Sequence, residues 1–414
     1  MRLNYRHTVL ASYIGYITQA IINNLPPLLF VTFNTHYGIP LERIGLLVSI
    51  NFGVQILIDL LAARYIDRIG YRVGVVAAHV FCVAGLVLLG VLPRVMPDAY
   101  AGLVIAMVCN AVGGGLIEVL ISPIVESVPG DAKASAMSLL HSFYCWGHVA
   151  VVLLSTLYFA TAGIANWYCL PFIWALVPLF NIFFFARVPL RVLVEESERV
   201  PLGKLFAAKT FLILFMLMIC AGASEQAMSQ WSSLFAESGL RVSKTMGDLL
   251  GPCMFAALMG CSRLLYGIFG ERLNIRRGLL GSALLCIASY LIAVLSPWPG
   301  LSLVGCGLCG LSVGLMWPGT FSLASATYPQ GGTAMFAILA LAGDVGCAGG
   351  PGLVGLVSGI VERLGNWTQG WFYGAGATEA GLKAGLTLAL VFPILMALGL
   401  LWLRKRREKG RERP

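Results

Sequence analysis

A glutamate within an apolar stretch is the side chain of this sequence best suited to chemistry. Glu118 lies in GGGLIEVLISPIVE (113–126), and Ser122 and Pro123 follow it four and five residues later. A carboxyl group inside a membrane helix is costly, so a functional role is the first hypothesis. Desolvation favours the neutral acid, which can then exchange protons. The alternative is a permanently protonated glutamate that only donates a hydrogen bond between helices.

Three further stretches place polar side chains along one face of an expected helix, because residues four apart share a face. The residues concerned are Gln19 with Asn23 and Asn24, Asn51 with Gln55 and Asp59, and Glu225 with Gln226, Ser229 and Trp231. Amides donate and accept hydrogen bonds, and an indole ring can stack on the C–H face of a sugar. The set therefore predicts a binding site for a small polar solute such as a sugar. The alternative is that these groups bind neighbouring membrane helices.

The elements that carry these residues are membrane-spanning helices. The 414-residue chain is 58% hydrophobic and 11% charged, with a mean hydropathy of +0.84, whereas soluble domains are usually about a quarter charged. A span takes about 20 mostly apolar residues. Twelve such stretches are predicted, at residues 8–33, 41–63, 73–93, 99–125, 134–161, 167–186, 210–236, 245–270, 278–296, 300–327, 333–361 and 384–403.

Lysine and arginine indicate the orientation, since cytoplasmic segments retain them during insertion. With both termini in the cytoplasm, 21 of the 28 basic residues lie there, and the net charge of +9 follows mainly from topology. The basic tail (404–414) is expected to contact anionic lipid headgroups rather than nucleic acid. The first apolar stretch is too long for a cleavable signal. The sequence thus predicts an integral protein of the cell inner (plasma) membrane, expected as a monomer.

The chain divides into two similar halves. Residues 65–74 (YIDRIGYRVG) align with 269–278 (FGERLNIRRG), which matches Asp67 to Glu271. Both segments join the second and third spans of their half, and such duplication is typical of transporters. The predicted organisation is an N-terminal six-helix bundle (1–186), a cytoplasmic linker (187–209), a C-terminal six-helix bundle (210–403) and the basic tail.

The turn after the second span carries a signature. Asp67-Arg68-Ile69-Gly70-Tyr71-Arg72, with Ala63 in place of a leading glycine, resembles the G-x-x-x-D-R-x-G-x-R loop of the major facilitator superfamily. With twelve spans in a six-plus-six division, the resemblance covers the whole chain. It implies an all-α fold of two six-helix bundles around a central cavity that opens alternately to each side. We expect the first, fourth, seventh and tenth helices to wall this cavity, with Asn23, Glu118 and Trp231 facing it.

Within that superfamily, Glu118-x-x-x-Ser122-Pro123 resembles the E-x-x-x-N-P of the fucose:proton symporter family. Asn23-Asn24-Leu25 is similar to that family's N-N-L. There the family continues with an aspartate implicated in coupling, whereas this chain has Pro26-Pro27. The departure makes Glu118 the candidate proton site and weakens the case that the cargo is fucose.

Arg263 is the strongly basic side chain within a predicted span, at the position that the repeat relates to Asp59. Because the fifth and eighth helices are neighbours in the superfamily, we expect Arg263 beside His141 and near Glu118. A buried guanidinium needs an acidic partner. Two mechanisms remain open. Proton arrival at Glu118 could release Arg263 toward Asp344, or a fixed bridge from Arg263 to an acid could close the inner gate.

The first hypothesis is therefore a secondary transporter that takes up a sugar or a similar polar solute with protons, although sodium remains open as the coupling ion. The alternative is a proton-coupled drug or metabolite exporter, but residues 145–150 lack the proline and glycine pair of the exporters' G-x-x-x-G-P-x-x-G-G. A sensor or lipid-handling protein of the same fold is a third hypothesis. No nucleophile, metal or phosphate-binding motif stands out, so neither enzymatic activity nor a cofactor or metal is expected.

Overall fold

The computed structural model describes residues 3–126, 128, 133–190, 208–269, 274–328, 332–364 and 376–411. The regular structure within these ranges is entirely helical, and twelve stretches are long and apolar enough to cross a membrane. The predicted all-α class with twelve spans is confirmed. Most of the predicted linker (187–209) and Glu271 in the second loop lie outside the described residues.

Six spans make up each half of the chain. The first half contains α1 (Tyr5–Asn24) with η1 (Pro26–Leu29) and α2 (Phe30–Tyr37), α3 (Leu41–Ile69), α4 (Tyr71–Val95), α5 (Ala99–Glu126), α6 (Lys133–Ala162), and η2 (Ile164–Cys169) with α7 (Leu170–Arg187). The second half contains α9 (Lys209–Leu234) with η3 (Phe235–Gly239), α10 (Lys244–Asp248) with η4 (Leu249–Cys253) and α11 (Met254–Phe269), α12 (Ile275–Leu295), α13 (Pro299–Thr327), α14 (Gly332–Leu364), and α15 (Ala377–Ala389) with α16 (Val391–Arg411).

Prolines and glycines account for several breaks between these segments. Pro26 and Pro27 lack the amide hydrogen that a continuing α-helix needs, and the first span passes through the 3₁₀ turn η1 at that point. Gly38 follows α2 with a φ of 64°, and Gly70 follows α3 with a φ of 93°. Both conformations favour glycine because a side chain would be strained there.

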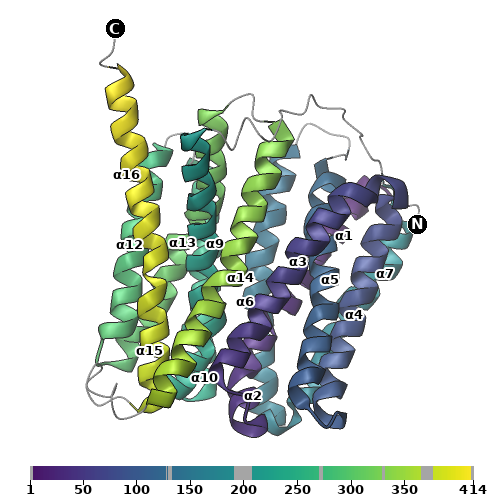
Figure 1. The fold of residues 1–414 in the computed structure, drawn as a ribbon. Coiled ribbons are helices and arrows are strands. Elements are labelled where there is room, and N and C mark those ends of the chain that lie inside the picture. The colour runs from purple at the N-terminus through teal and green to yellow at the C-terminus, as the bar shows by residue number, and fades with distance from the viewer. Residues whose placement is uncertain are drawn as a thin grey trace.

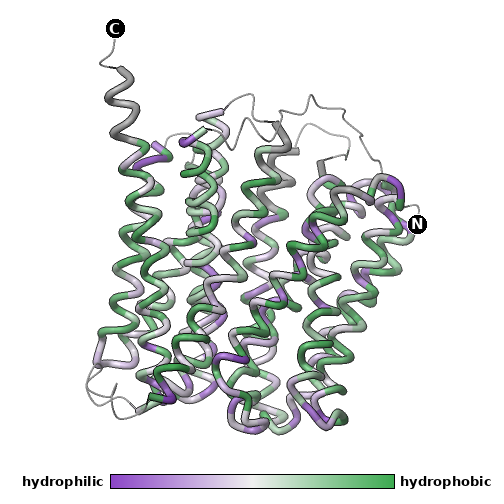
Figure 2. The backbone as a smooth tube through the Cα atoms, in the orientation of Figure 1, coloured by the Kyte–Doolittle hydropathy of each residue, from purple (hydrophilic) through white to green (hydrophobic). Residues whose placement is uncertain are grey.

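The two halves lie side by side, and both chain termini lie at the same end of the bundle (Figure 1). We call this the termini end and the opposite one the far end. Apolar residues run along most of the helices, and hydrophilic residues are frequent near the helix ends (Figure 2). Large apolar side chains on the outside, such as Leu57, Leu176 and Leu398, are exposed. Such a surface suits a hydrocarbon environment.

The two halves meet closely toward the far end, where α3 packs against α14. Ser49 Oγ donates a hydrogen bond to Ala348 O at 2.8 Å. Glycines bring the two backbones into contact, because a Cβ atom at Gly355 would lie 2.7 Å from Gly45 Cα. Small residues are a common means of close helix packing in membranes. The approach of α3 to α14 therefore depends on the absence of side chains at these two positions.

We expect Gly355→Val to lower the thermal unfolding midpoint of the detergent-purified protein. The new side chain would have to displace Gly45 Cα, Leu41 O and the Trp231 ring, all within 2.9 Å of the added Cβ. Such overpacking typically costs about 1–3 kcal/mol. Gly349→Val is the matched control on the same helix, because nothing lies within 4 Å of a Cβ there. Equal midpoints for Gly355→Val and wild type would contradict the packing argument.

Candidate functional site

A cavity of about 380 Å³ lies between the two halves. Its walls come from α1, α3, α5 and α6 of the first half and from α9, α11, α13 and α14 of the second. The second, fifth, eighth and eleventh spans thus contribute together with the four spans expected from the sequence. The lining residues are Tyr16, Gln19, Asn23, Phe52, Glu118, His141, Ser142, Tyr144, Glu225, Gln226, Arg263, Tyr266, Gly267, Trp317, Pro318, Phe321, Asp344 and Cys347.

Glu118 reaches this cavity from α5. Its Oε2 accepts a hydrogen bond of 3.0 Å from Gln19 Nε2 on α1. One turn further along α5, Ser122 Oγ lies 3.1 Å from Tyr16 OH, also on α1. Side-chain hydrogen bonds between α1 and α5 therefore orient the glutamate and attach the serine to the cavity-lining tyrosine, although Ser122 itself is not part of the lining.

Arg263 reaches the cavity from α11 and pairs with Glu225 on α9, with 3.3 Å between Nη2 and Oε2. Both side chains are largely buried, at 17% and 9% exposed. His141 lines the same cavity. In this structure Arg263 therefore forms a bridge to an acid of its own half, Glu225, and not the pairing with Glu118 or Asp344 that the first of the two mechanisms invokes. The long guanidinium side chain crosses to α9 because the two helices face the same space.

Two aspartates form a contact between the halves. Asp344 on α14 lines the cavity and is 6% exposed. The carboxyl group of Asp59 on α3 lies within hydrogen-bonding reach of it, and Asp59 Oδ1 has no hydrogen-bond partner among the described residues. Ionised carboxylates only accept hydrogen bonds, so a bond between these two groups requires a proton on one of them.

An amide network occupies the side of the cavity nearest the far end. Asn23 Oδ1 accepts hydrogen bonds of 3.2 Å from both Asn51 Nδ2 and Gln55 Nε2. Asn24 Nδ2 instead donates to Ala20 O at 2.9 Å and lies 3.4 Å from Tyr144 OH. Of the two asparagines predicted to bind a solute, the structure places Asn23 in the lining, whereas Asn24 bonds to its own helix at Ala20 O and lies near Tyr144 of α6.

Trp231 does not line the cavity. Its side chain is fully buried, and Nε1 donates to Pro351 O at 3.0 Å. The ring lies 5.8 Å from that of Phe30. Ser229 is also buried outside the lining. The expectation that Trp231 faces the cavity therefore does not match its position, because α9 turns its Glu225 and Gln226 side toward the cavity and its tryptophan toward α14.

The sequence interpretation missed the aromatic part of the lining, which consists of Tyr16, Phe52, Tyr144, Tyr266, Trp317 and Phe321. Aromatic residues occur throughout the spans, so their presence alone does not separate cavity from lipid. A usable signal was their spacing from polar residues. Tyr16 lies three residues before Gln19 and Tyr266 three after Arg263, and residues three apart are neighbours on a helix surface.

The loop motif lies away from the cavity, at the termini end. Arg72 donates to three backbone carbonyl groups at the end of α7, at 2.8 to 2.9 Å. The last carbonyl groups of a helix lack intrahelical donors, so Arg72 fastens the start of α4 to the end of the sixth span. Gly70 supplies the left-handed turn and Arg68 is exposed. The side chain of Asp67 lies outside the described part of the structure.

The comparisons with known proteins agree with this architecture. The family described as Major Facilitator Superfamily matches residues 11–351. No curated protein matches the sequence. Similar solved structures include a bacterial homologue of the human lysosomal transporter Spinster in an inward-facing and occupied conformation, with a TM-score of 0.76, 15% identity and coverage of 97% of each chain.

Two further similar structures are a D-xylose–proton symporter and the nucleoside transporter NupG. The symporter has a TM-score of 0.72 and 16% identity, covering 94% of this chain and 97% of the other. NupG has a TM-score of 0.68 and 14% identity, covering 95% and 98%. At these identities the likeness is one of fold, whereas the family match spans most of the sequence. The chain belongs to the major facilitator superfamily.

Proposed function

We propose that the protein carries a small polar solute of the sugar class into the cell together with protons, by alternating access. The observation that carries this proposal is a cavity between two packed halves that combines Glu118 with amide, hydroxyl and aromatic groups. We further propose that the protein acts as a monomer in the plasma membrane, with the termini end facing the cytoplasm. The basic segments at that end support this orientation.

Glu118 is the proposed proton carrier. The hydrogen bond from Gln19 gives it an uncharged partner, whereas the positive charge of Arg263 is taken up by Glu225. An acid without a cationic partner can gain or lose its proton as the cavity exchanges water with one side or the other. The Asp59–Asp344 contact offers a second dependence on protons, because a hydrogen bond between two carboxyl groups needs a proton on one of them.

The cavity supports a neutral, polar cargo. Gln19, Asn23 and Gln226 offer amide donors and acceptors, and the Trp317 ring offers the apolar stacking face that the sequence had assigned to Trp231. Amides suit hydroxyl groups because they both donate and accept. The similarity to a D-xylose–proton symporter supports the same class of cargo.

The first test separates cargo exchange from accumulation. Glutamine at position 118 resembles the protonated acid but cannot release a proton. We expect Glu118→Gln in liposomes to exchange labelled for unlabelled cargo at close to the wild-type rate. Its accumulation under an inward proton gradient should fall by about 10²-fold or more, as is typical when a positioned proton-transfer group is lost.

The control for this test is Glu362→Gln, because Glu362 lies outside the cavity and accepts from Thr378 Oγ1 through an oxygen that glutamine also has. It should accumulate cargo as wild type does. Gradient-driven accumulation at the wild-type level by Glu118→Gln would remove Glu118 as the proton carrier and direct attention to Glu225, Asp59 or Asp344. Accumulation only under an outward gradient would indicate export.

A second prediction concerns the Arg263–Glu225 pair. Arg263→Leu leaves a buried carboxylate without its cation, and breaking such a pair costs about 3 kcal/mol or more. We expect lost transport and a lower unfolding midpoint, with Arg263→Lys only partly effective because a point charge replaces a planar fork. The double variant Arg263→Leu, Glu225→Gln should regain thermal stability but not transport. Normal uptake by Arg263→Leu would exclude the pair from the mechanism.

The charge balance of the cavity yields a third prediction. Its lining contains three acids, Glu118, Glu225 and Asp344, against the single guanidinium of Arg263. Neutral sugars should therefore bind more tightly than the corresponding sugar acids. A ligand at 100 times its Kd stabilises the native state by about 2.7 kcal/mol, so a thermal-shift panel of matched sugars and sugar acids measures the preference. A larger shift with a sugar acid would contradict a neutral cargo.

A further inference from the structure

The first span is interrupted at Pro26 and Pro27 in a way that frees a backbone acceptor. In a continuous α-helix the N–H of residue 27 would donate to the carbonyl oxygen of Asn23. Proline has no N–H, so the chain's own backbone cannot satisfy that oxygen. A free carbonyl at membrane depth needs a partner from elsewhere in the protein.

The partners of this break come from the other half of the molecule. Gln230 on α9, only 2% exposed, donates through Nε2 to Asn23 O at 3.2 Å. Lys244, the first residue of α10, donates through Nζ to Leu28 O at 2.7 Å. Two side chains of the second half thus donate hydrogen bonds to carbonyl groups on either side of the double proline. We call these two contacts the proline-break docking.

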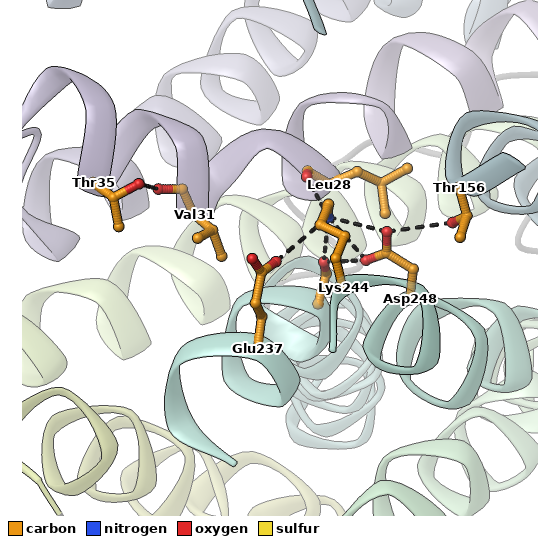
Figure 3. Close-up of polar contacts among 8 residues, drawn as sticks. Leu28, Val31, Thr35, Thr156, Glu237, Lys244 and Asp248 are labelled. Atoms are coloured by element: carbon orange, nitrogen blue, oxygen red, sulfur yellow. Dashed lines mark hydrogen bonds and ion pairs between the residues drawn. The ribbon is translucent and has the colours of Figure 1, made fainter. Parts of the chain in front are cut away.

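The lysine is held in place by neighbouring charges. Lys244 Nζ lies 3.0 Å from Asp248 Oδ2 and 3.7 Å from Glu237 Oε2. Asp248 also accepts a hydrogen bond of 3.3 Å from Thr156 on α6 of the first half. Figure 3 shows Lys244 between Leu28, Glu237 and Asp248, with Thr156 on the opposite side of Asp248. Hydrogen bonds from a charged donor are about twice as strong as neutral ones, so this contact contributes strongly to the junction.

The side-chain amide of Gln230 also connects to the cavity. Gln230 Nε2 lies 3.1 Å from Gln226 Oε1, and Gln226 Nε2 donates to Glu225 Oε1 at 3.4 Å. Gln226 and Glu225 line the cavity, whereas Gln230 lies beyond them. A cargo that takes over a hydrogen bond of Gln226 changes the partners of the side chain that contacts Asn23 O. Binding in the cavity and closure of the far end are therefore linked through the hydrogen bond between Gln226 and Gln230.

We propose that Gln230 and Lys244 are positioning residues that keep the far end closed by docking on the carbonyl groups at the Pro26–Pro27 break. Opening toward the far side then requires both side chains to leave the break. The inference rests on alternating access in the proposed function, but it concerns an equilibrium between conformations and needs neither cargo nor a proton gradient for its test. It also gives a role to Pro26 and Pro27, which stand where the fucose:proton symporter family, which the sequence resembles, has an aspartate.

The chain supplies its own probe for the test. Cys347 lines the cavity, so a membrane-impermeant maleimide applied from the far side of sealed vesicles reaches it only when the far end opens. Cys347→Ser identifies the signal of this thiol. We expect the labelling rate to rise roughly tenfold in Lys244→Met and roughly fivefold in Gln230→Leu, because a charged and a neutral hydrogen bond are lost, respectively. Lys244→Arg keeps the charged donor and should label slowly.

Two further variants separate the loss of the docking contacts from a general destabilisation of the fold. Lys383→Met is the matched control, because Lys383 is also buried and pairs with an acid four residues away, Glu379, but within its own half. It should label at the wild-type rate. Pro27→Ala restores an N–H that can donate to Asn23 O, so it should raise labelling like Gln230→Leu, and the two changes together should be less than additive.

Wild-type labelling rates in Lys244→Met, Gln230→Leu and Pro27→Ala would overturn the proposal, as would an equal rise in Lys383→Met. Both outcomes are independent of uptake. If the variants label at the expected faster rates but the wild-type protein accumulates no cargo, the result counts against the proposed function alone. If the wild-type protein accumulates cargo but the variants label at the wild-type rate, the result counts against the docking alone.

Discussion

Polar and ionisable groups inside a membrane must find their partners within the protein, and much of this structure follows from that constraint. Arg263 forms an ion pair with Glu225, Glu118 accepts a hydrogen bond from Gln19, and Lys244 forms an ion pair with Asp248. The hydrocarbon cannot hydrogen-bond to any of them. The Arg263–Glu225 and Glu118–Gln19 pairings each join two helices, so the same contacts that solvate these charged groups also position the walls of the cavity.

The pairings differ in whether they bridge the two halves. Arg263 and Glu225 belong to the second half and can stay together while the halves move. Asp59 and Asp344 belong to different halves, and a hydrogen bond between their carboxyl groups needs a proton on one of them. The repeat expected from the sequence relates Asp59 to Arg263, so an acidic and a basic residue occupy equivalent positions. In the proposed function the proton carrier, Glu118, lies within the first half, whereas the Asp59–Asp344 contact lies at the junction between the halves.

Backbone groups obey the same constraint as side chains. Pro26 and Pro27 interrupt the first span after α1, and Gln230 and Lys244 of the other half donate to carbonyl groups on either side of that break. Glycines act in a different way, because Gly45 and Gly355 let the backbones of α3 and α14 touch beside the hydrogen bond from Ser49 to Ala348 O. The far end thus combines polar docking at the first span with close packing between α3 and α14.

The sequence by itself determined the twelve spans, the helical class, the loop signature and the presence of Glu118, Asp59, Asp344 and Arg263 within spans. These properties depend on local hydropathy, charge and spacing. Only the tertiary structure decided that Arg263 pairs with Glu225, 38 residues away, and that Trp231 faces Pro351, 120 residues away, rather than the cavity. The partner of a buried group depends on which helices are neighbours and how each is rotated about its axis, and packing of the whole bundle sets both.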